Sequence, residues 1–115
     1  MALPVLDENV TDAEFDVMVE NATRATEFMK ALAHEGRLLI LCQLASGEKS
    51  VTELEELLSS RQAAVSQQLA RLRLEGLVNH RREGKAIYYS LKDERAVRIL
   101  ELLYELFCKD DARTA

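Results

Sequence analysis

The stretch "SVTELEELLSSRQAAVSQQLARLRLEGLVNHRREGKAIYYSL", residues 50–91, decides the fold. Ser50, with Glu53 three residues later, fits a capping box that opens a helix over "VTELEELL". Ser59-Ser60 breaks that helix and can cap the next one, "RQAAVSQQLARLRLEG", which ends at Gly76. Two short helices joined by a tight polar turn predict a helix-turn-helix.

After Gly76 the hydrophobic pattern changes from helical to alternating. In "LVNHRREGKAIYYSL", β-branched and aromatic residues flank "REGK", which predicts a β-hairpin that turns at Glu83-Gly84. Tyr88 and Tyr89 alternate faces, so at least one of them should pack into the core. A hairpin after a helix-turn-helix is the arrangement of a winged helix.

Three further helices are expected around this centre. The first, "AEFDVMVENATRATEFMKALA", follows Asp12 as its cap; the second, "RLLILCQLA", is apolar nearly all round and ends at Ser46-Gly47; the last follows Asp93. The fold class is therefore mainly α, a winged helix-turn-helix with about five helices and a hairpin wing. Apolar seams on the first and last helices need a partner. They comprise Phe15, Met18, Ala22, Ala25, Met29 and Leu32 on the first helix, and Val97, Leu100, Leu103, Tyr104 and Phe107 on the last.

Length and composition indicate one globular domain over residues 1–115, with residues 1–12 expected to be a loose acidic leader. No stretch approaches the roughly 20 apolar residues of a membrane span, and the acidic start is unlike an export signal, so we expect no membrane partner and a cytoplasmic location. In that compartment two cysteines are inert, metal-binding or redox-active rather than a structural disulfide.

Charge is distributed unevenly along the chain. The net charge is −5, but residues 60–92 carry seven basic and two acidic side chains, so this segment is +5 and the remainder −10. A basic block inside an acidic chain is typical of a surface that binds a polyanion, although a merely solvated face would look similar.

The second helix of the helix-turn-helix carries residues suited to double-stranded DNA. Val65, Leu69 and Leu72 fall on one side and should face the core. The residues expected to contact bases are Gln62, Ala63, Ser66 and Gln67, because amide and hydroxyl groups hydrogen-bond base edges and alanine can touch a thymine methyl. Those expected to contact phosphates, from this helix and from the wing, are Arg61, Arg71, Arg73, Arg82 and Lys85. The wing cations could equally protect an edge strand from pairing.

Three segments together resemble the ArsR/SmtB family of bacterial repressors: "ALAHEGRLLILCQL", "SVTELEELLSSRQAAVSQQLARLRLEGLV" and "REGKAIYYSL". The resemblance covers residues 14–108. It implies a homodimer built on the first and last helices that binds a palindromic operator and releases it when an inducer binds. One small helix-turn-helix makes few base contacts, which independently favours a dimer.

Most members of that family sense metals, but the ligand positions are not filled here. Arsenic-type members have a Cys-x-Cys pair at the start of the helix that here reads "VTELEELL", and zinc-type members have histidines on the last helix, which here has none. His34 and His80 are isolated and read as a helix-junction and a hairpin-surface residue. We therefore expect no metal and no other cofactor.

The two cysteines, Cys42 and Cys108, resemble those of the persulfide-sensing (SqrR/BigR-like) branch of the family. That resemblance implies that low-molecular-weight persulfides bridge the two thiols with sulfur and that the bridged form leaves the DNA. We expect Cys42 to be packed away from water, since it lies in the apolar run "RLLILCQLA". The alternatives are that both cysteines are simply small core residues, or that the repressor answers another signal: peroxide, a thiophilic metal or haem.

Two other classes of function are less favoured by the sequence. The helix-turn-helix could serve protein contacts alone, without DNA. An enzyme is disfavoured, because no nucleophile is paired with a base and no glycine loop for phosphate is present.

Overall fold

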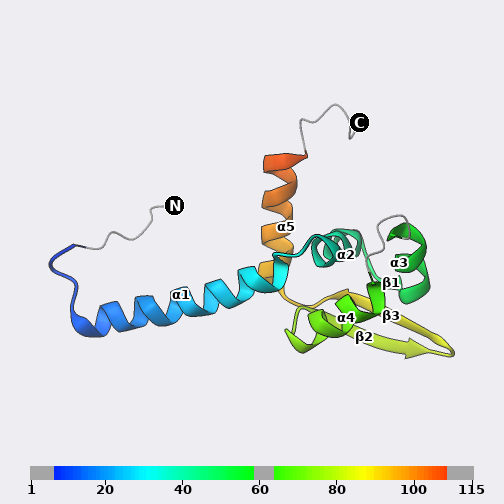
Figure 1. Ribbon diagram of the computed structural model, residues 1–115, viewed down its shortest axis with the longest axis horizontal. Coiled ribbons are helices and arrows are strands. Elements are labelled where there is room, and N and C mark those ends of the chain that lie inside the picture. The colour runs from blue at the N-terminus through cyan, green and yellow to red at the C-terminus, as the bar shows by residue number, and fades with distance from the viewer. Residues whose placement is uncertain (1–6, 59–63, 109–115) are drawn as a thin grey trace. The chain divides into compact units, whose positions relative to one another are not determined.

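The computed structural model describes residues 7–58 and 64–108. The chain falls into two compact units, residues 1–32 and 33–115. The elements are listed here in chain order: α1 Asp12–Leu32, α2 Glu35–Ala45, β1 Lys49–Ser50, α3 Val51–Leu58, α4 Val65–Leu74, β2 Val78–Glu83, β3 Ala86–Leu91 and α5 Glu94–Phe107 (Figure 1). The predicted winged helix-turn-helix is confirmed, with five helices and the wing in the described residues.

The first unit is the single helix α1. It begins at Asp12, but the cap is Thr11: the Thr11 hydroxyl accepts the N–H of Glu14 at 3.1 Å and donates to the Glu14 carboxylate at 3.0 Å. The prediction that Asp12 is the cap is therefore wrong by one residue, because the Thr11 hydroxyl accepts an N–H of the first turn, which is what a cap residue does. Phe15 and Met29 of the predicted seam are half or more exposed.

The core of the second unit is built mainly from leucines. The fully buried large side chains are Ile40 and Leu41 of α2, Leu54 of α3, Leu69 and Leu72 of α4, and Leu77 just before β2. Each such side chain contributes about 1.5–3 kcal/mol by leaving water. Val65 is buried with Leu69 and Leu72, which confirms the predicted inner face of α4. This core fixes α4 against α2 and α3.

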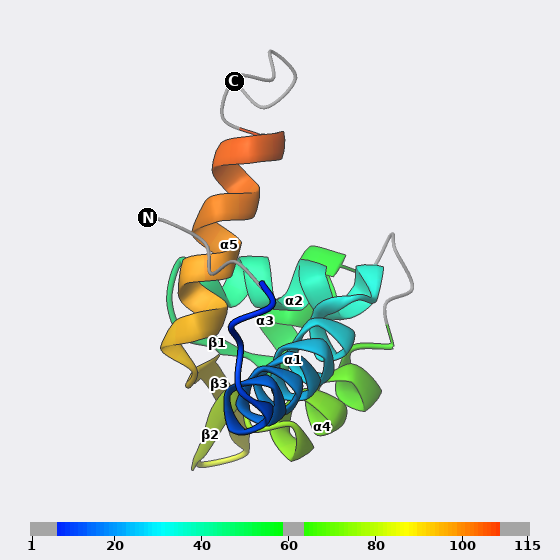
Figure 2. The same ribbon diagram turned by 90° about the vertical axis from the view of Figure 1, so that its left-hand side faces the viewer.

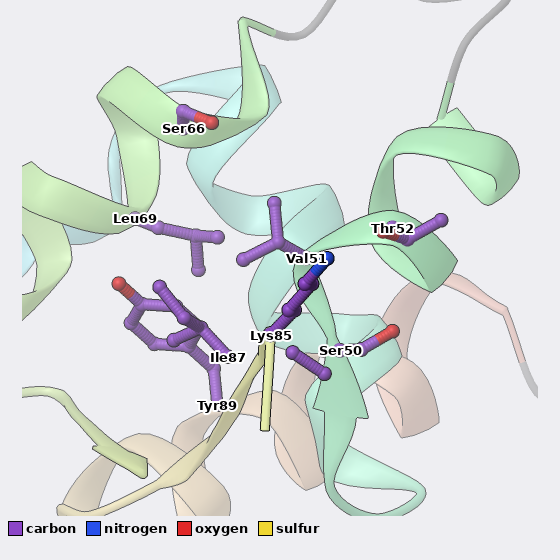
Figure 3. Close-up of a pocket in the computed structure, with 9 residues that line it drawn as sticks. Ser50, Val51, Thr52, Ser66, Leu69, Lys85, Ile87 and Tyr89 are labelled. Carbon is purple, nitrogen blue, oxygen red and sulfur yellow. The ribbon is translucent and has the colours of Figure 1, made fainter. Parts of the chain in front are cut away.

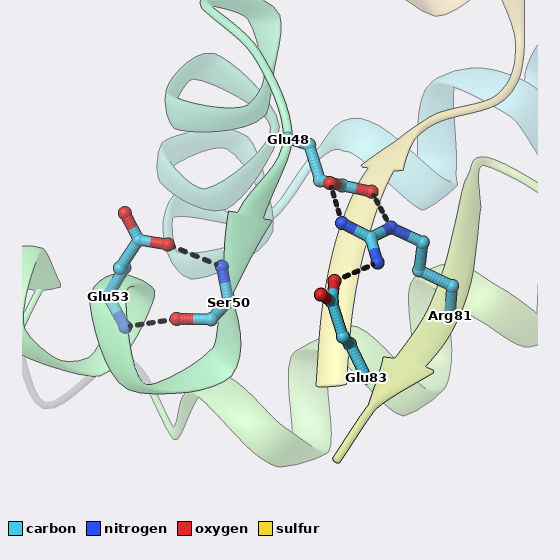
Figure 4. Close-up of polar contacts among 5 residues, drawn as sticks. All are labelled: Glu48, Ser50, Glu53, Arg81 and Glu83. Carbon is cyan, nitrogen blue, oxygen red and sulfur yellow. Dashed lines mark hydrogen bonds and ion pairs between the residues drawn. The ribbon is translucent and has the colours of Figure 1, made fainter. Parts of the chain in front are cut away.

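Polar caps fix where α2 and α3 begin. His34 caps α2, its Nδ1 accepting the N–H groups of Gly36 at 3.1 Å and Arg37 at 3.4 Å. At α3 the predicted capping box is confirmed: Ser50 Oγ accepts the Glu53 N–H at 3.1 Å and the Ser50 N–H donates to the Glu53 carboxylate at 2.9 Å (Figure 4). Ser50 also belongs to β1, a two-residue strand that is too short to leave a pattern in the sequence.

The helix α4 is shorter than the sequence suggests. It begins at Val65, after Ala64 in a left-handed conformation with φ of 49°, and the predicted start at Arg61 lies outside the described residues. Its end is as expected. Gly76 has φ of 76°, its N–H donates to Arg73 and the next N–H, of Leu77, donates to Leu72, each at 3.0 Å. This pair of bonds is a Schellman motif, which requires the left-handed glycine.

The wing is an antiparallel hairpin in a three-stranded sheet of order β1-β3-β2. Its register pairs Val78 with Leu91 and Glu83 with Ala86, so the turn residues are Gly84 and Lys85, one position later than predicted. Tyr89 is buried and Tyr88 half-buried, as the alternation requires. In Figure 1 the hairpin extends as an arm with its turn at the far end.

The last helix, α5, is capped by Asp93, whose carboxylate accepts the Arg95 N–H at 2.8 Å, as predicted. Ala96 and Leu100 anchor its first half in the core. Figure 2 shows its last turns projecting away from the other helices of the second unit. The large apolar side chains of this part are exposed: Leu102, Tyr104, Leu106 and Phe107. No helix among residues 7–58 and 64–108 is long and apolar enough to cross a bilayer.

Candidate nucleic-acid interface and thiol site

The outer face of α4 presents two of the residues predicted to contact bases. Ser66 and Gln67 are exposed in its first turn; Gln67 is opposite the buried residues of this helix, and Ser66 is at the side of them. The other two predicted contacts, Gln62 and Ala63, lie outside the described residues, as does Arg61. The N-terminal half of a recognition helix is the part that enters the major groove, and Ser66 and Gln67 belong to that half of α4.

Two arginines flank this face toward the end of α4. Arg71 and Arg73 are both exposed. Arg71 forms an ion pair with Glu75 one turn later, with 3.2 Å between Nε and the carboxylate. Because both partners are well exposed, the pair is weak, and a DNA phosphate can take the place of Glu75.

The wing and the helix-turn-helix border a common hollow of about 320 Å³. It is bounded by the start of α3, by Ser66 and Leu69 of α4, and by Ile87 and Tyr89 of β3 (Figure 3). The Lys85 side chain reaches across it toward the start of α3. Lys85 and Ser66 therefore line the same hollow, so the wing cation and the outer face of α4 form one surface. Arg82, on β2, is also exposed.

Arg81, a third basic residue of the wing, is held by the protein itself. Its guanidinium donates two hydrogen bonds to Glu48, at 2.8 and 2.7 Å, and one to Glu83 at 2.6 Å (Figure 4). It also lies 4.6 Å over the Tyr88 ring. These hydrogen bonds raise the pKa of Arg81 and lower that of Glu48. The sequence signals neither contact: the pairing of Arg81 with Tyr88 depends on the hairpin register, which differs by one position from the predicted turn, and Glu48 is far away in the chain.

Cys42 does not lie where the sequence predicts. Its side chain is exposed, so the expectation that it is packed away from water is wrong. The buried residues of α2 are Gly36, Ile40, Leu41 and Leu44, which share one face, and Cys42 points roughly the opposite way. The apolar run does not reveal this orientation, because its residues are apolar both where they face the core and where, as at Cys42, they face a groove.

The groove lies between α2 and α5 and has a volume of about 580 Å³. Cys42 and Ala45 form one wall; Val97, Leu100, Glu101, Tyr104 and Glu105 form the other. Part of the Cys42 sulfur is thereby shielded even though the side chain as a whole is exposed. This partial burial raises the pKa of the Cys42 thiol above its ordinary value.

Cys108 lies one turn beyond Tyr104, a residue of the groove wall, but does not itself line the groove. It is the C-cap residue of α5, half-buried, and its N–H donates to the Tyr104 carbonyl at 2.9 Å. A negative charge on Cys108 is the second cause that raises the pKa of Cys42. The structure thus brings the two cysteines, which belong to different helices, within electrostatic reach of one another.

Across residues 7–58 and 64–108, no group of three or more His, Cys, Asp or Glu side chains is placed to hold a metal ion. His34 is the α2 cap, and His80 is exposed on β2 with its ring 6.0 Å from that of Tyr89. Both histidines therefore have the structural positions that were predicted for them.

A helix-turn-helix with an exposed recognition helix and a basic wing defines the class of winged-helix DNA-binding proteins. Residues 34–80 match the family model described as "Bacterial regulatory protein, arsR family". The chain is 44% identical over 100 residues to the biofilm growth-associated repressor of Agrobacterium fabrum, an alignment that covers 87% of this chain and 86% of that protein. The chain belongs to the ArsR family.

Solved structures of related regulators have a similar fold. The structure titled reduced HlyU from Vibrio cholerae has a TM-score of 0.75 and 43% identity, covering 80% of this chain and 97% of that one. The transcriptional repressor BigR from Xylella fastidiosa has a TM-score of 0.74 and 38% identity, covering 83% and 97%. On these grounds the protein is a DNA-binding regulator of transcription and not an enzyme, as the sequence predicted.

Proposed function

We propose that this regulator is a homodimeric repressor that binds a palindromic operator and releases it when low-molecular-weight persulfides bridge Cys42 and Cys108 with sulfur. The observation that carries the proposal is that Cys42 is exposed at the α2–α5 groove and that Cys108, at the end of α5, is near enough for its charge to raise the pKa of Cys42. Two thiols that come from separate helices and lie near one another are what an intramolecular bridge needs. An inert core thiol would be buried, and Cys42 is not in the core.

On the DNA side, we assign base contacts to Ser66 and Gln67, and propose the same role for Gln62 and Ala63, which are outside the described residues. Backbone phosphates are assigned to the exposed cations of α4 and the wing: Arg71, Arg73, Arg82 and Lys85, together with Arg61. Phosphate contacts position the protein and base contacts select the sequence. Arg81 is left out of this set because its guanidinium is already bound to two carboxylates.

The dimer is proposed from exposed apolar surface. On α5, Leu106 and Phe107 are 65% and 72% exposed, and on α1 Phe15 and Met29 are 50% and 58% exposed. Contiguous exposed apolar surface of this kind marks a protein–protein contact. Two copies would also supply two recognition helices, which is what a palindromic site requires.

The chemistry proceeds by sulfur transfer to a thiolate. The Cys42 thiolate attacks the outer sulfur of a persulfide R–S–SH; the new bond forms to Cys42, the donor S–S bond breaks and RS⁻ leaves. Two more donors extend the chain in the same way, to Cys42–S–S–S–SH. The Cys108 thiolate then attacks the sulfur next to the terminal one, expels HS⁻ and closes a bridge with two added sulfur atoms. A direct disulfide requires Cα atoms within about 7 Å, whereas a longer chain spans a wider gap.

The bridge acts on DNA through α2. This helix carries Cys42 and packs on α4, while α5 carries Cys108 and the exposed apolar side chains proposed to form the dimer. Tying α2 to α5 therefore fixes the recognition helix relative to the dimer-forming helix. Half-site spacing is a geometric requirement, so a changed spacing weakens binding to the palindrome.

The test treats the reduced protein with excess glutathione persulfide to completion and maps the peptides by mass spectrometry. A peptide pair joining Cys42 to Cys108, with two sulfurs gained and two hydrogens lost, and weaker operator binding, are expected. Cys42→Ser and Cys108→Ser proteins should each bind DNA but not respond. A Cys42→Ser protein that still responds fully would refute the dithiol and direct attention to peroxide, a thiophilic metal or haem.

A further inference from the structure

The groove beside Cys42 is acidic as well as apolar. Glu101 and Glu105 lie one turn apart on α5, and both line the groove that Cys42 faces. The seven lining residues include these two carboxylates and no lysine, arginine or histidine. Both glutamates are exposed carboxylates.

An anion approaching Cys42 therefore has to pass two like charges. Two unit charges 4 Å apart repel by about 1 kcal/mol in bulk water, and by more beside an apolar wall, where the effective dielectric constant is lower. A neutral donor meets no such barrier, and a cation is attracted. The apolar residues Val97, Leu100 and Tyr104 on the same wall favour an uncharged sulfur chain.

We propose that Glu101 and Glu105 make Cys42 select its sulfur donor by charge, so that neutral and cationic persulfides react faster than anionic ones. This rests on the proposed function for the nature of the donor, but the charge selection is a property of the groove alone. The attack is the same for each donor: the Cys42 thiolate takes the outer sulfur, the donor S–S bond breaks, and the donor thiolate leaves.

Charge selection is measured first without persulfide. In a Cys108→Ser background, Cys42 is labelled by two methanethiosulfonates, one bearing a trimethylammonium and one a sulfonate. Each reaction forms a mixed disulfide and expels methanesulfinate. The ratio of the cationic to the anionic rate is divided by the same ratio for 2-mercaptoethanol, which removes the intrinsic difference between the reagents. Any change in the thiolate fraction of Cys42 cancels in the ratio.

The normalised ratio of the cationic to the anionic labelling rate should be about 10 at low salt, and it should fall toward one as salt screens the carboxylates. The double variant Glu101→Gln/Glu105→Gln should bring the ratio close to one. Glu94→Gln, an exposed glutamate of the same helix that does not line the groove, is the matched control and should leave it unchanged. A ratio near one in the parent, or one that the double variant does not change, would overturn the proposal.

A second measurement uses three persulfides on the protein with both cysteines, made from cysteamine, 2-mercaptoethanol and glutathione. Bridging rates should fall in that order, and the spread should collapse in the double variant. If all three bridge at equal rates, the charge selection is wrong and the proposed function stands. If none bridges while the labelling ratio is high, the proposed function is wrong and the groove still selects by charge.

Discussion

At the scale of single residues, the position of the Cys42 side chain could not be predicted from the hydrophobic pattern of the sequence. The run around it predicts a buried helix, and Ile40, Leu41 and Leu44 are indeed buried. Cys42 lies on the other face of α2, where its neighbours come from α5 and are remote in sequence. The sequence could identify both thiols as the candidates for sensing, but not that Cys42 faces a groove with Cys108 nearby, because that depends on how α2 and α5 pack.

The reactivity of Cys42 should depend on pH in a defined way. Burial and the charge of Cys108 both raise the pKa of Cys42, and the thiolate is the nucleophile. Its alkylation by iodoacetamide should therefore keep accelerating above the pH at which an ordinary cysteine levels off. Cys108→Ser removes one of the two causes and should move the profile to lower pH. An unchanged profile in that variant would show that the two thiols do not interact.

At the scale of elements, the caps could be predicted from the sequence and the tertiary contacts could not. The Ser50–Glu53 box, the Asp93 cap and the Gly76 end are local, so they leave local signals. The strand β1 and the Glu48–Arg81 contact join segments that are distant in sequence, and no local rule signals them.

The capping box of α3 should be a measurable part of the stability. Ser50→Ala removes the acceptor for the Glu53 N–H and should lower the free energy of unfolding by about 1 kcal/mol, read from chemical denaturation. Ser50→Thr keeps a hydroxyl at the cap and should recover most of the loss. Equal stability of the alanine and threonine variants would mean that the cap contributes nothing.

Two basic residues of the wing, Lys85 and Arg81, should differ in how their replacement changes the salt dependence of DNA binding. Lys85→Ala, if the side chain neutralises one phosphate, should reduce the slope of log affinity against log salt by about one. Arg81→Ala should leave that slope unchanged, since its guanidinium is bound to Glu48 and Glu83. A slope that falls in the Arg81 variant and not in the Lys85 variant would reverse these assignments.

At the scale of the whole molecule, the order of the five helices and the wing was correctly predicted, because each of these has its own pattern; β1 was not predicted. In a single chain, the apolar surface near the end of α5 is exposed. Leu106→Glu should therefore dissociate the proposed dimer, measured by sedimentation velocity, and weaken operator binding. Leu57→Glu is the matched control, a leucine of α3 that is 52% exposed and should leave the dimer intact. A Leu106 variant that remains dimeric would remove α5 from the interface.

The most direct test compares the operator affinity of the purified bridged protein with that of the same preparation after reduction. Coupling between two sites in a regulator is commonly 1–3 kcal/mol, so the bridged protein should bind at least about fivefold more weakly, and reduction should restore the affinity. Equal dissociation constants for the bridged and the reduced protein would contradict the claim that a sulfur tether between Cys42 and Cys108 releases the DNA.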